Sequence, residues 1–203
     1  MARTIKFSKE DILEKSVEFI KENGYSKLTV RELTKYIGCS TQPIFKNYAN
    51  FDMYKEDLKL YLRKDYTSFI NKYIDINDYL YTISYAYAFY AKKEPNVFFS
   101  LFMADLAGSR TVSEVLNTNR NRETIDAMEK QYNISKTEAE RVFREVRFYT
   151  HGIATQLCVK SIKLTDVEIK NLIKNNIKMN LGGIKLWIYM KEIKNKEHSL
   201  MKR

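Results

Sequence analysis

The side chains best suited to chemistry in this sequence lie together in one short stretch. Thr41, Gln42, Lys46 and Asn47 are polar or cationic and closely spaced. The amide of Gln42 can make a bidentate contact with adenine, and Lys46 can reach guanine or a phosphate. The methyl group of Thr41 can contact a thymine methyl. This composition is typical of a helix that reads DNA, and the alternative is the solvated face of an ordinary helical bundle.

Such side chains need helices that position them, and the preceding sequence predicts two. Ser8 can cap a first helix, which Gly24 ends. Thr29 and Glu32 form a capping box for a second helix, which ends at Gly38. Each helix therefore has a start and a stop signal.

A third helix follows the glycine turn, capped by Ser40 and running through Tyr48. Steps of about 100° per residue place Ile44 and Tyr48 on one side and Gln42 and Lys46 on the other. The first side is expected to pack against the other helices, and the second is free to contact DNA. Two short helices joined by a tight turn with glycine form a helix-turn-helix, and the first helix braces the pair.

The run from Ser8 to Leu58 resembles the DNA-binding domain of the TetR family of transcriptional regulators. The matching segments are Gly24-Tyr25, Thr29-Val30-Arg31-Glu32-Leu33, Ile37-Gly38-Cys39-Ser40, Phe45 and Tyr48. The resemblance implies a recognition helix at residues 41–47. The expected DNA-contacting residues are Arg31, Ser40, Thr41, Gln42, Pro43, Phe45, Lys46, Asn47 and Lys55.

Two positions depart from the family pattern. The family often has tyrosine where this chain has Phe45, so a phosphate-bonding hydroxyl is lost. The family usually has a phosphate-binding lysine where this chain has Phe51. Lys55 or Lys46 could take over that contact.

Composition sets the fold class. With six glycines and two prolines in 203 residues, the chain has too few turn residues for an α/β or all-β protein, so an all-α fold is expected. The enzyme motifs GxSxG, HExxH, GxGxxG and the P-loop are absent, and His151 and His198 are far apart. We therefore expect no enzyme activity, no metal and no cofactor, although an all-α enzyme without motifs is a remote alternative.

Charge and hydropathy indicate the compartment and the partner. The net charge of +10 favours a polyanionic partner such as double-stranded DNA. The sequence shows no signal peptide and no apolar run of about 18 residues, and Cys39 and Cys158 have no disulfide or zinc spacing. A cytoplasmic protein with no membrane contact is expected.

Residues 51–203 read as a larger helical domain after the DNA-binding domain of residues 1–50. A connecting helix over about 52–73 begins after Asn50. Capping boxes open the last two helices. The further helices are expected over 78–93, 95–107, 112–131, 136–162 and 166–194, with a loop over residues 117–122 as the alternative for the early part of the third.

The apolar surface of the last helix is wider than one protomer's core requires. The resemblance assigns the final two helices to a four-helix interface of a homodimer, which would place two recognition helices on a palindromic operator. The alternative is a helix buried within one monomer. The expected interface residues are Gly152, Ile173, Ile177, Gly182, Ile184 and Trp187.

The chain has fifteen tyrosines and eleven phenylalanines, and many of them lie between residues 79 and 102. Aromatic side chains with a polar tip can line an apolar cavity, as in the effector pocket that the resemblance implies. The alternative is an aromatic core. The candidate pocket residues are Tyr87, Tyr90, Phe99, Met103, Phe148 and His151.

Together these features predict a ligand-responsive repressor that binds a palindromic operator as a homodimer and is released by a small-molecule effector. The alternative is a DNA-binding regulator without an effector.

Overall fold

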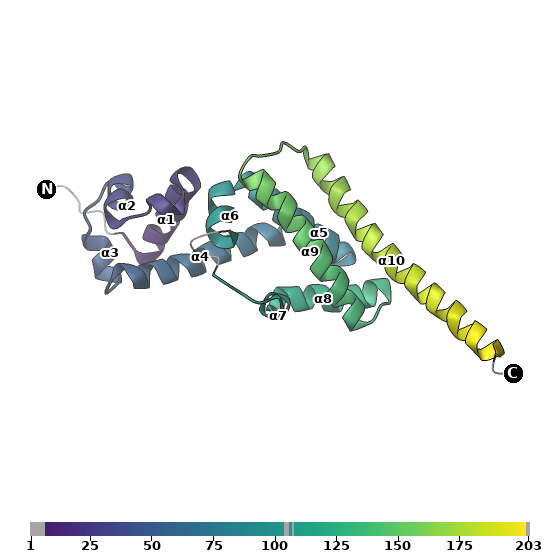
Figure 1. Ribbon diagram of the computed structural model, residues 1–203. Coiled ribbons are helices and arrows are strands. Elements are labelled where there is room, and N and C mark those ends of the chain that lie inside the picture. Colours follow the sequence, from purple (N-terminus) through teal and green to yellow (C-terminus); the bar gives the residue numbers. More distant parts are fainter. Residues whose placement is uncertain (1–6, 104–105, 107, 202–203) are drawn as a thin grey trace. The chain divides into compact units, whose positions relative to one another are not determined.

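The computed structural model describes residues 7–103, 106 and 108–201, with side chains as far as residue 183. Within these residues it contains α-helices and two short 3-10 turns, and no strand, so the all-α expectation is confirmed (Figure 1). The helices are α1 Lys9–Asn23, α2 Val30–Ile37, α3 Gln42–Asn47, α4 Phe51–Asn71, α5 Tyr79–Lys93, α6 Pro95–Phe102, α7 Val112–Leu116, α8 Asn119–Tyr132, α9 Lys136–Cys158 and α10 Asp166–Met201.

The chain divides into two compact units, each made of three separate segments. The first unit comprises Met1–Lys72, Tyr90–Ser109 and Ala154–Ile162. The second comprises Tyr73–Phe89, Arg110–Ile153 and Lys163–Arg203. The first three helices therefore share a unit with α4 and α6.

In the first unit, α1 is the central helix and contacts α2, α3, α4 and α6. Its start is fixed by a capping box in which the Ser8 hydroxyl and Asp11 bond to each other's backbone N–H groups. The Asn50 side chain accepts a hydrogen bond from the N–H of Met53 at the start of α4. The apolar faces meet in a core of Ile12, Ile20, Leu33, Ile44, Leu58 and Leu62, all fully buried.

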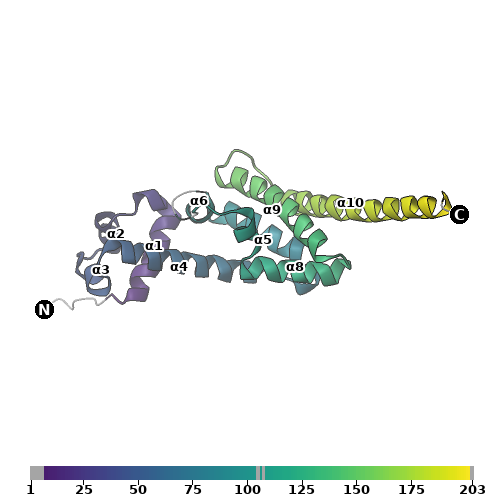
Figure 2. The ribbon, with the colours of Figure 1, turned by 60° about the horizontal axis from the view of Figure 1, so that its bottom comes forward.

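In the second unit, α10 contacts α5 through two cations that lie over aromatic rings. Lys170 Nζ lies 4.9 Å from the ring centre of Tyr85, and Lys174 Nζ lies 4.6 Å from that of Tyr81. The two tyrosines are four residues apart on α5 and the two lysines are four residues apart on α10, so each pair lies on one face of its helix. Figure 2 shows α9 and α10 from a second direction.

Several helix ends differ from the sequence expectation. The helix expected over 95–107 ends at Phe102, because Met103 leaves the helical conformation. The helix expected over 112–131 is divided at Asn117–Thr118 into α7 and α8. α10 extends to Met201 instead of 194, since no proline or glycine follows Gly183 to end it.

The end of α9 has a specific cause. It stops at Cys158 instead of 162, because Lys160 adopts a left-handed φ of 57°. The N–H of Ser161 then bonds to the carbonyl of Gln156 at 3.0 Å, as in a Schellman-type helix end.

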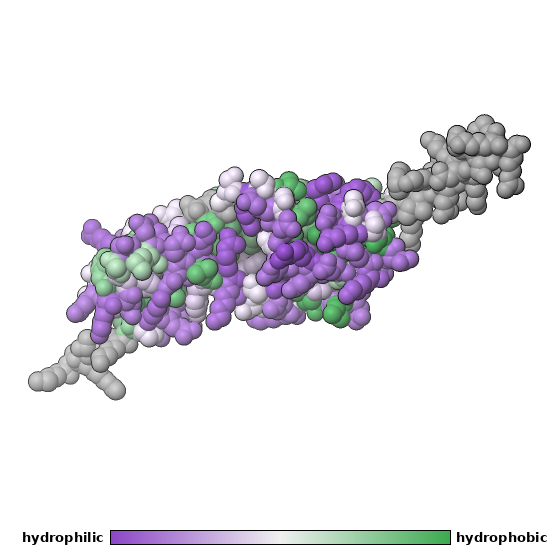
Figure 3. Space-filling view, turned by 90° about the horizontal axis from the view of Figure 1, so that it is seen from below, coloured by the Kyte–Doolittle hydropathy of each residue, from purple (hydrophilic) through white to green (hydrophobic). Residues whose placement is uncertain are grey.

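The molecular face in Figure 3 is mainly hydrophilic, with small hydrophobic patches. None of the described helices combines the length and apolar character that crossing a membrane requires.

Candidate nucleic-acid interface

Two buried side chains fix the orientation of α3 in the first unit. Ile44 is fully buried and Tyr48, directly after the helix, is buried as well. The Tyr48 ring packs edge-on against Tyr54 of α4, with ring centres 5.4 Å apart. The predicted packing side of the third helix is therefore confirmed.

The turn before α3 depends on Gly38, which has the left-handed φ of 77° that glycine adopts at little cost. The N–H groups of Gly38 and Cys39 both donate to the carbonyl of Thr34, at 2.9 and 3.0 Å. These bonds close α2 and direct the chain into α3.

The start of α3 differs from the expectation. The predicted N-cap, Ser40, lies one residue too early, and Thr41 occupies the N-cap position without a side-chain bond. The Ser40 hydroxyl instead accepts a 3.4 Å hydrogen bond from the N–H of Gln42. This bond spans two residues, so it supports the turn and does not cap the helix.

The side of α3 away from the core is open. Gln42, Phe45 and Lys46 are exposed, and half of the Phe45 side chain is accessible to solvent. Asn47 is exposed, but its amide donates a 2.8 Å hydrogen bond to the carbonyl of Pro43, which is half-buried. Ser40 and Thr41 are exposed in the preceding turn. The structure therefore brings seven of the nine expected DNA-contacting residues onto one short segment.

The other two expected residues lie on neighbouring helices. Arg31 is exposed on α2. Lys55 on α4 is half-buried, and its Nζ lies 3.1 Å from the Asp52 carboxylate and 5.1 Å from the Phe51 ring centre. Its charge is therefore balanced within α4, whereas neither Arg31 nor Lys46 forms an ion pair with a described residue.

The sequence reasoning missed one cation. Lys35 is exposed on α2, four residues after Arg31, and so lies on the same face of that helix. The i,i+4 spacing of Arg31 and Lys35 is the signal that could have identified it. Together they give α2 two exposed cations on one face.

Tyr48 remains neutral at any ordinary pH. Burial, helped by the negative charge of Asp57, raises the pKa of its hydroxyl to about 12. Lys9 pairs with Asp57, and its Nζ lies 5.1 Å from the centre of the Tyr48 ring. Tyr48 therefore packs in the core, on the side of α3 opposite the exposed residues.

The candidate pocket residues fall into two groups of three. Tyr90, Phe99 and Met103 belong to the first unit, where Tyr90 is buried, Met103 half-buried and Phe99 exposed. In the second unit Tyr87 is buried, His151 half-buried and Phe148 exposed.

Within the second unit, the structure brings Tyr87 and His151 together. The Tyr87 hydroxyl lies 2.9 Å from His151 Nδ1, and the Arg147 guanidinium lies 4.5 Å from the Tyr87 ring centre. Burial, followed by the charge of Arg147, lowers the pKa of His151. Both effects favour the neutral form of the imidazole in the folded protein.

Within the first unit, Tyr90 lies in an aromatic cluster. Its ring centre is 5.1 Å from that of Tyr66 and 4.9 Å from that of Phe69, and Phe102 packs against Tyr66 at 4.9 Å. The Tyr90 hydroxyl is buried without a hydrogen-bond partner in the described structure. A buried hydroxyl without a partner has a free-energy cost, which a polar group of a ligand could remove.

The residues expected at the dimer interface differ in their exposure. Ile173 and Ile177 are buried within their own chain, whereas Gly152 and Gly182 are exposed. A Cβ atom added at either glycine would meet nothing within 4 Å. The side chains of Ile184 and Trp187 lie outside the described residues.

The described residues contain no group of three or more His, Cys, Asp and Glu side chains that could hold a metal ion. Both cysteines are free thiols.

Comparison with known proteins shows a similarity of fold. No family profile matches the sequence, and no curated protein matches it. The chain is similar in structure to a TetR-like transcriptional regulator from Rhodococcus sp. RHA1, with a TM-score of 0.59 and 11% sequence identity. The match covers 90% of this chain and 99% of the regulator. The chain therefore has the fold of TetR-like regulators, as its motifs predict.

Proposed function

We propose that this protein is a transcriptional repressor that binds a palindromic operator as a homodimer and is released by a small-molecule effector. The observation that carries the proposal is the two-sided character of α3. Ile44 holds one side in the core, while Gln42, Phe45 and Lys46 are exposed on the other. The similarity to a protein described as a TetR-like transcriptional regulator supports the same function.

Each exposed residue of α3 has a role that its chemistry supports. The Gln42 amide can bond to two adjacent atoms of adenine, and the Phe45 ring can pack on a thymine methyl. Lys46, Arg31 and Lys35 can contact phosphates, which fix the position of the protein on the duplex without reading sequence.

The homodimer is supported by an exposed apolar face in the second unit. On α9, Phe148 is 57% and Tyr149 38% exposed, and Gly152 follows Phe148 by one helical turn. On α10, Met179 is 76% exposed and Gly182 lies three residues further on. Large apolar side chains beside exposed glycines suit the close approach of helices from a second copy, whose two recognition helices would read two half-sites about 34–36 Å apart.

The effector response is supported by the buried, unpartnered hydroxyl of Tyr90 and the aromatic rings around it. A ligand that binds more tightly to a conformation with misaligned recognition helices shifts the population away from the DNA-bound form. The repressor would act in the cytoplasm, where the operator is accessible.

Selection from a pool of randomised duplexes at one stated salt concentration tests the proposal, since phosphate contacts make affinity salt-dependent. Enrichment of a short palindrome supports a dimeric, sequence-specific regulator. If folded protein enriches no sequence, the helix-turn-helix is a structural bundle and the proposal is wrong.

A further inference from the structure

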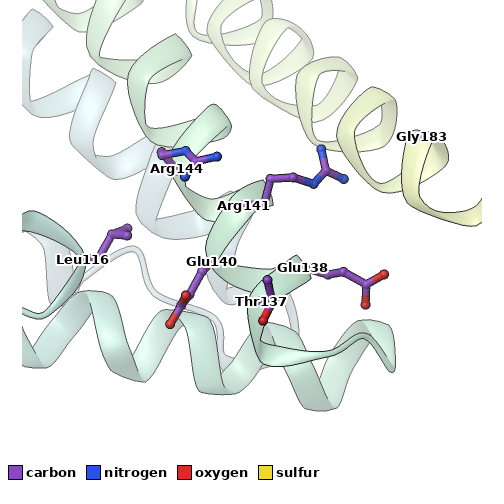
Figure 4. A pocket seen from close by; sticks show the side chains of 7 residues that line it. All are labelled: Leu116, Thr137, Glu138, Glu140, Arg141, Arg144 and Gly183. Carbon is purple, nitrogen blue, oxygen red and sulfur yellow. The ribbon is translucent and has the colours of Figure 1, made fainter. Parts of the chain in front are cut away.

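The second unit contains a groove that the proposed function does not use. It has a volume of about 600 Å³ and is open to solvent. Volumes of roughly 300 to 1,000 Å³ are typical of small-molecule sites. The groove is lined by Leu116, Thr137, Glu138, Glu140, Arg141, Arg144 and Gly183 (Figure 4).

Two arginines of α9 give the groove its charge. Arg141 and Arg144 are three residues apart and so lie on one face of the helix. Figure 4 shows the Arg141 side chain extending from α9 toward Gly183, the Arg144 side chain farther along α9, and the Glu140 side chain pointing away from Gly183. The groove therefore presents two guanidinium groups to a bound molecule.

The two arginines differ in their partners within the described residues. Arg141 forms no hydrogen bond or ion pair with any described residue, whereas Arg144 Nε forms an ion pair with the carboxylate of its neighbour Glu145, at 3.4 Å. The Glu138 carboxylate accepts hydrogen bonds from the backbone N–H and hydroxyl of Ser135, at 2.8 and 2.7 Å. That acid is therefore engaged in capping α9.

Two of the other lining residues have no polar side chain. Leu116 of α7 contributes an aliphatic side chain. On α10, a Cβ atom added at Gly183 would meet nothing within 4 Å, so a ligand can approach the helix backbone closely.

We propose that the groove between α9 and α10 binds an amphipathic organic anion, with its acidic head group on Arg141 and Arg144 and its apolar part against Leu116 and Gly183. The planar guanidinium fork matches a carboxylate or a phosphate through paired hydrogen bonds. The groove residues belong to the second unit, whereas the Tyr90 cluster belongs to the first.

The test uses the fluorescent anion anilinonaphthalene sulfonate and the uncharged phenylnaphthylamine. Combined R141Q and R144Q should raise the Kd of the anion about tenfold or more and leave that of the uncharged dye unchanged. A matched control, R110Q with K163Q, removes two exposed cations outside the groove and should change neither Kd. Equal binding of the anion by wild type and by R141Q/R144Q would overturn the proposal.

A second variant tests the opposite wall. Gly183→Leu fills the groove from α10 and should also weaken binding of the anion, and unchanged binding would contradict the assignment. Light scattering identifies the rival occupant, because conversion of a dimer to monomers by R141Q/R144Q would mean that a second copy of the chain fills the groove. Displacement of the dye by decanoate or by decyl phosphate distinguishes the two head groups, and displacement by neither would contradict the proposal.

Discussion

The hydroxyl of Tyr54 on α4 donates a 2.6 Å hydrogen bond to the hydroxyl of Ser16 on α1. Both residues are fully buried, and Ser16 passes the bond on to the carbonyl of Ile12. This pair joins the long helix α4 to the central helix of the first unit. Any movement of α4 relative to α1 must break it, so it helps to fix the frame that carries α3.

The first prediction concerns this bond. Tyr54→Phe should lower the free energy of unfolding by about 0.5–1.5 kcal/mol, since it removes one buried hydrogen bond and keeps the ring. Urea unfolding measures the change. Tyr61→Phe, on the same helix but half-buried, is the control and should leave the stability unchanged. An equal effect of both variants would show that the bond contributes nothing specific.

The second prediction separates two lysines. Lys46→Ala should weaken DNA binding, by about 1 to 3 kcal/mol if it contacts guanine, because its charge is exposed and unpaired. Lys55→Ala should have a much smaller effect, because Asp52 already balances its charge. Fluorescence anisotropy with a labelled duplex measures both. A larger loss for Lys55→Ala would assign the missing family phosphate contact to Lys55.

The third prediction concerns the turn into α3. Gly38→Ala should destabilise the protein by about 1–2 kcal/mol, because a side chain at a φ of 77° is strained. Gly38→Asn should cost less, since asparagine tolerates the left-handed region better. Thermal unfolding of the two variants checks the order. Equal stability of wild type and Gly38→Ala would mean that the turn relaxes.

The capping residues explain why most of the fold can be predicted from sequence. The pairs Ser8–Asp11, Ser135–Glu138 and Thr165–Glu168 act over three residues, and the structure contains both bonds of each box. Of the box predicted at Thr29 and Glu32, the structure shows the bond from the Glu32 N–H to the Thr29 hydroxyl. The end of α6 could not be predicted, because no local stop signal marks Phe102. The early end of α9 was missed for a different reason, since lysine rarely adopts the left-handed φ found at Lys160.

The candidate site shows the same limit. The period of the third helix correctly separates Ile44 from Gln42, because both sides of a short helix follow from its sequence. The apolar stripe of α10 cannot show which residues face their own chain. Ile173 and Ile177 are buried within the protomer, although the sequence suggested them for a dimer interface.

The fourth prediction tests the proposed dimer face. Phe148→Glu should leave the protomer folded, since the side chain is exposed, and should convert the dimer to monomers because it places a charge in an apolar interface. Light scattering measures the mass. Leu60→Glu, at another exposed apolar residue, should leave the mass unchanged. If both variants keep the wild-type mass, Phe148 lies outside any interface.

The fifth prediction concerns pH. Burial lowers the pKa of His151 below its ordinary value of 6.5, so the unfolded chain takes up a proton at a higher pH than the folded one. The free energy of unfolding should therefore fall as the pH drops below 6.5. His151→Gln should reduce this slope in urea titrations between about pH 5 and pH 8, which bracket the ordinary histidine pKa. If the free energy of unfolding of His151→Gln depends on pH as steeply as that of wild type, His151 does not contribute to the pH dependence.

The most direct test of the central claim is the specificity that α3 confers. Affinity should be measured at one salt concentration for the selected palindrome and for a shuffled duplex, with wild type and with Gln42→Ala. The account predicts that wild type prefers the palindrome by about 10³ or more, and that Gln42→Ala reduces this ratio while binding to shuffled DNA stays unchanged. Equal affinity of wild type for the two duplexes would contradict the account.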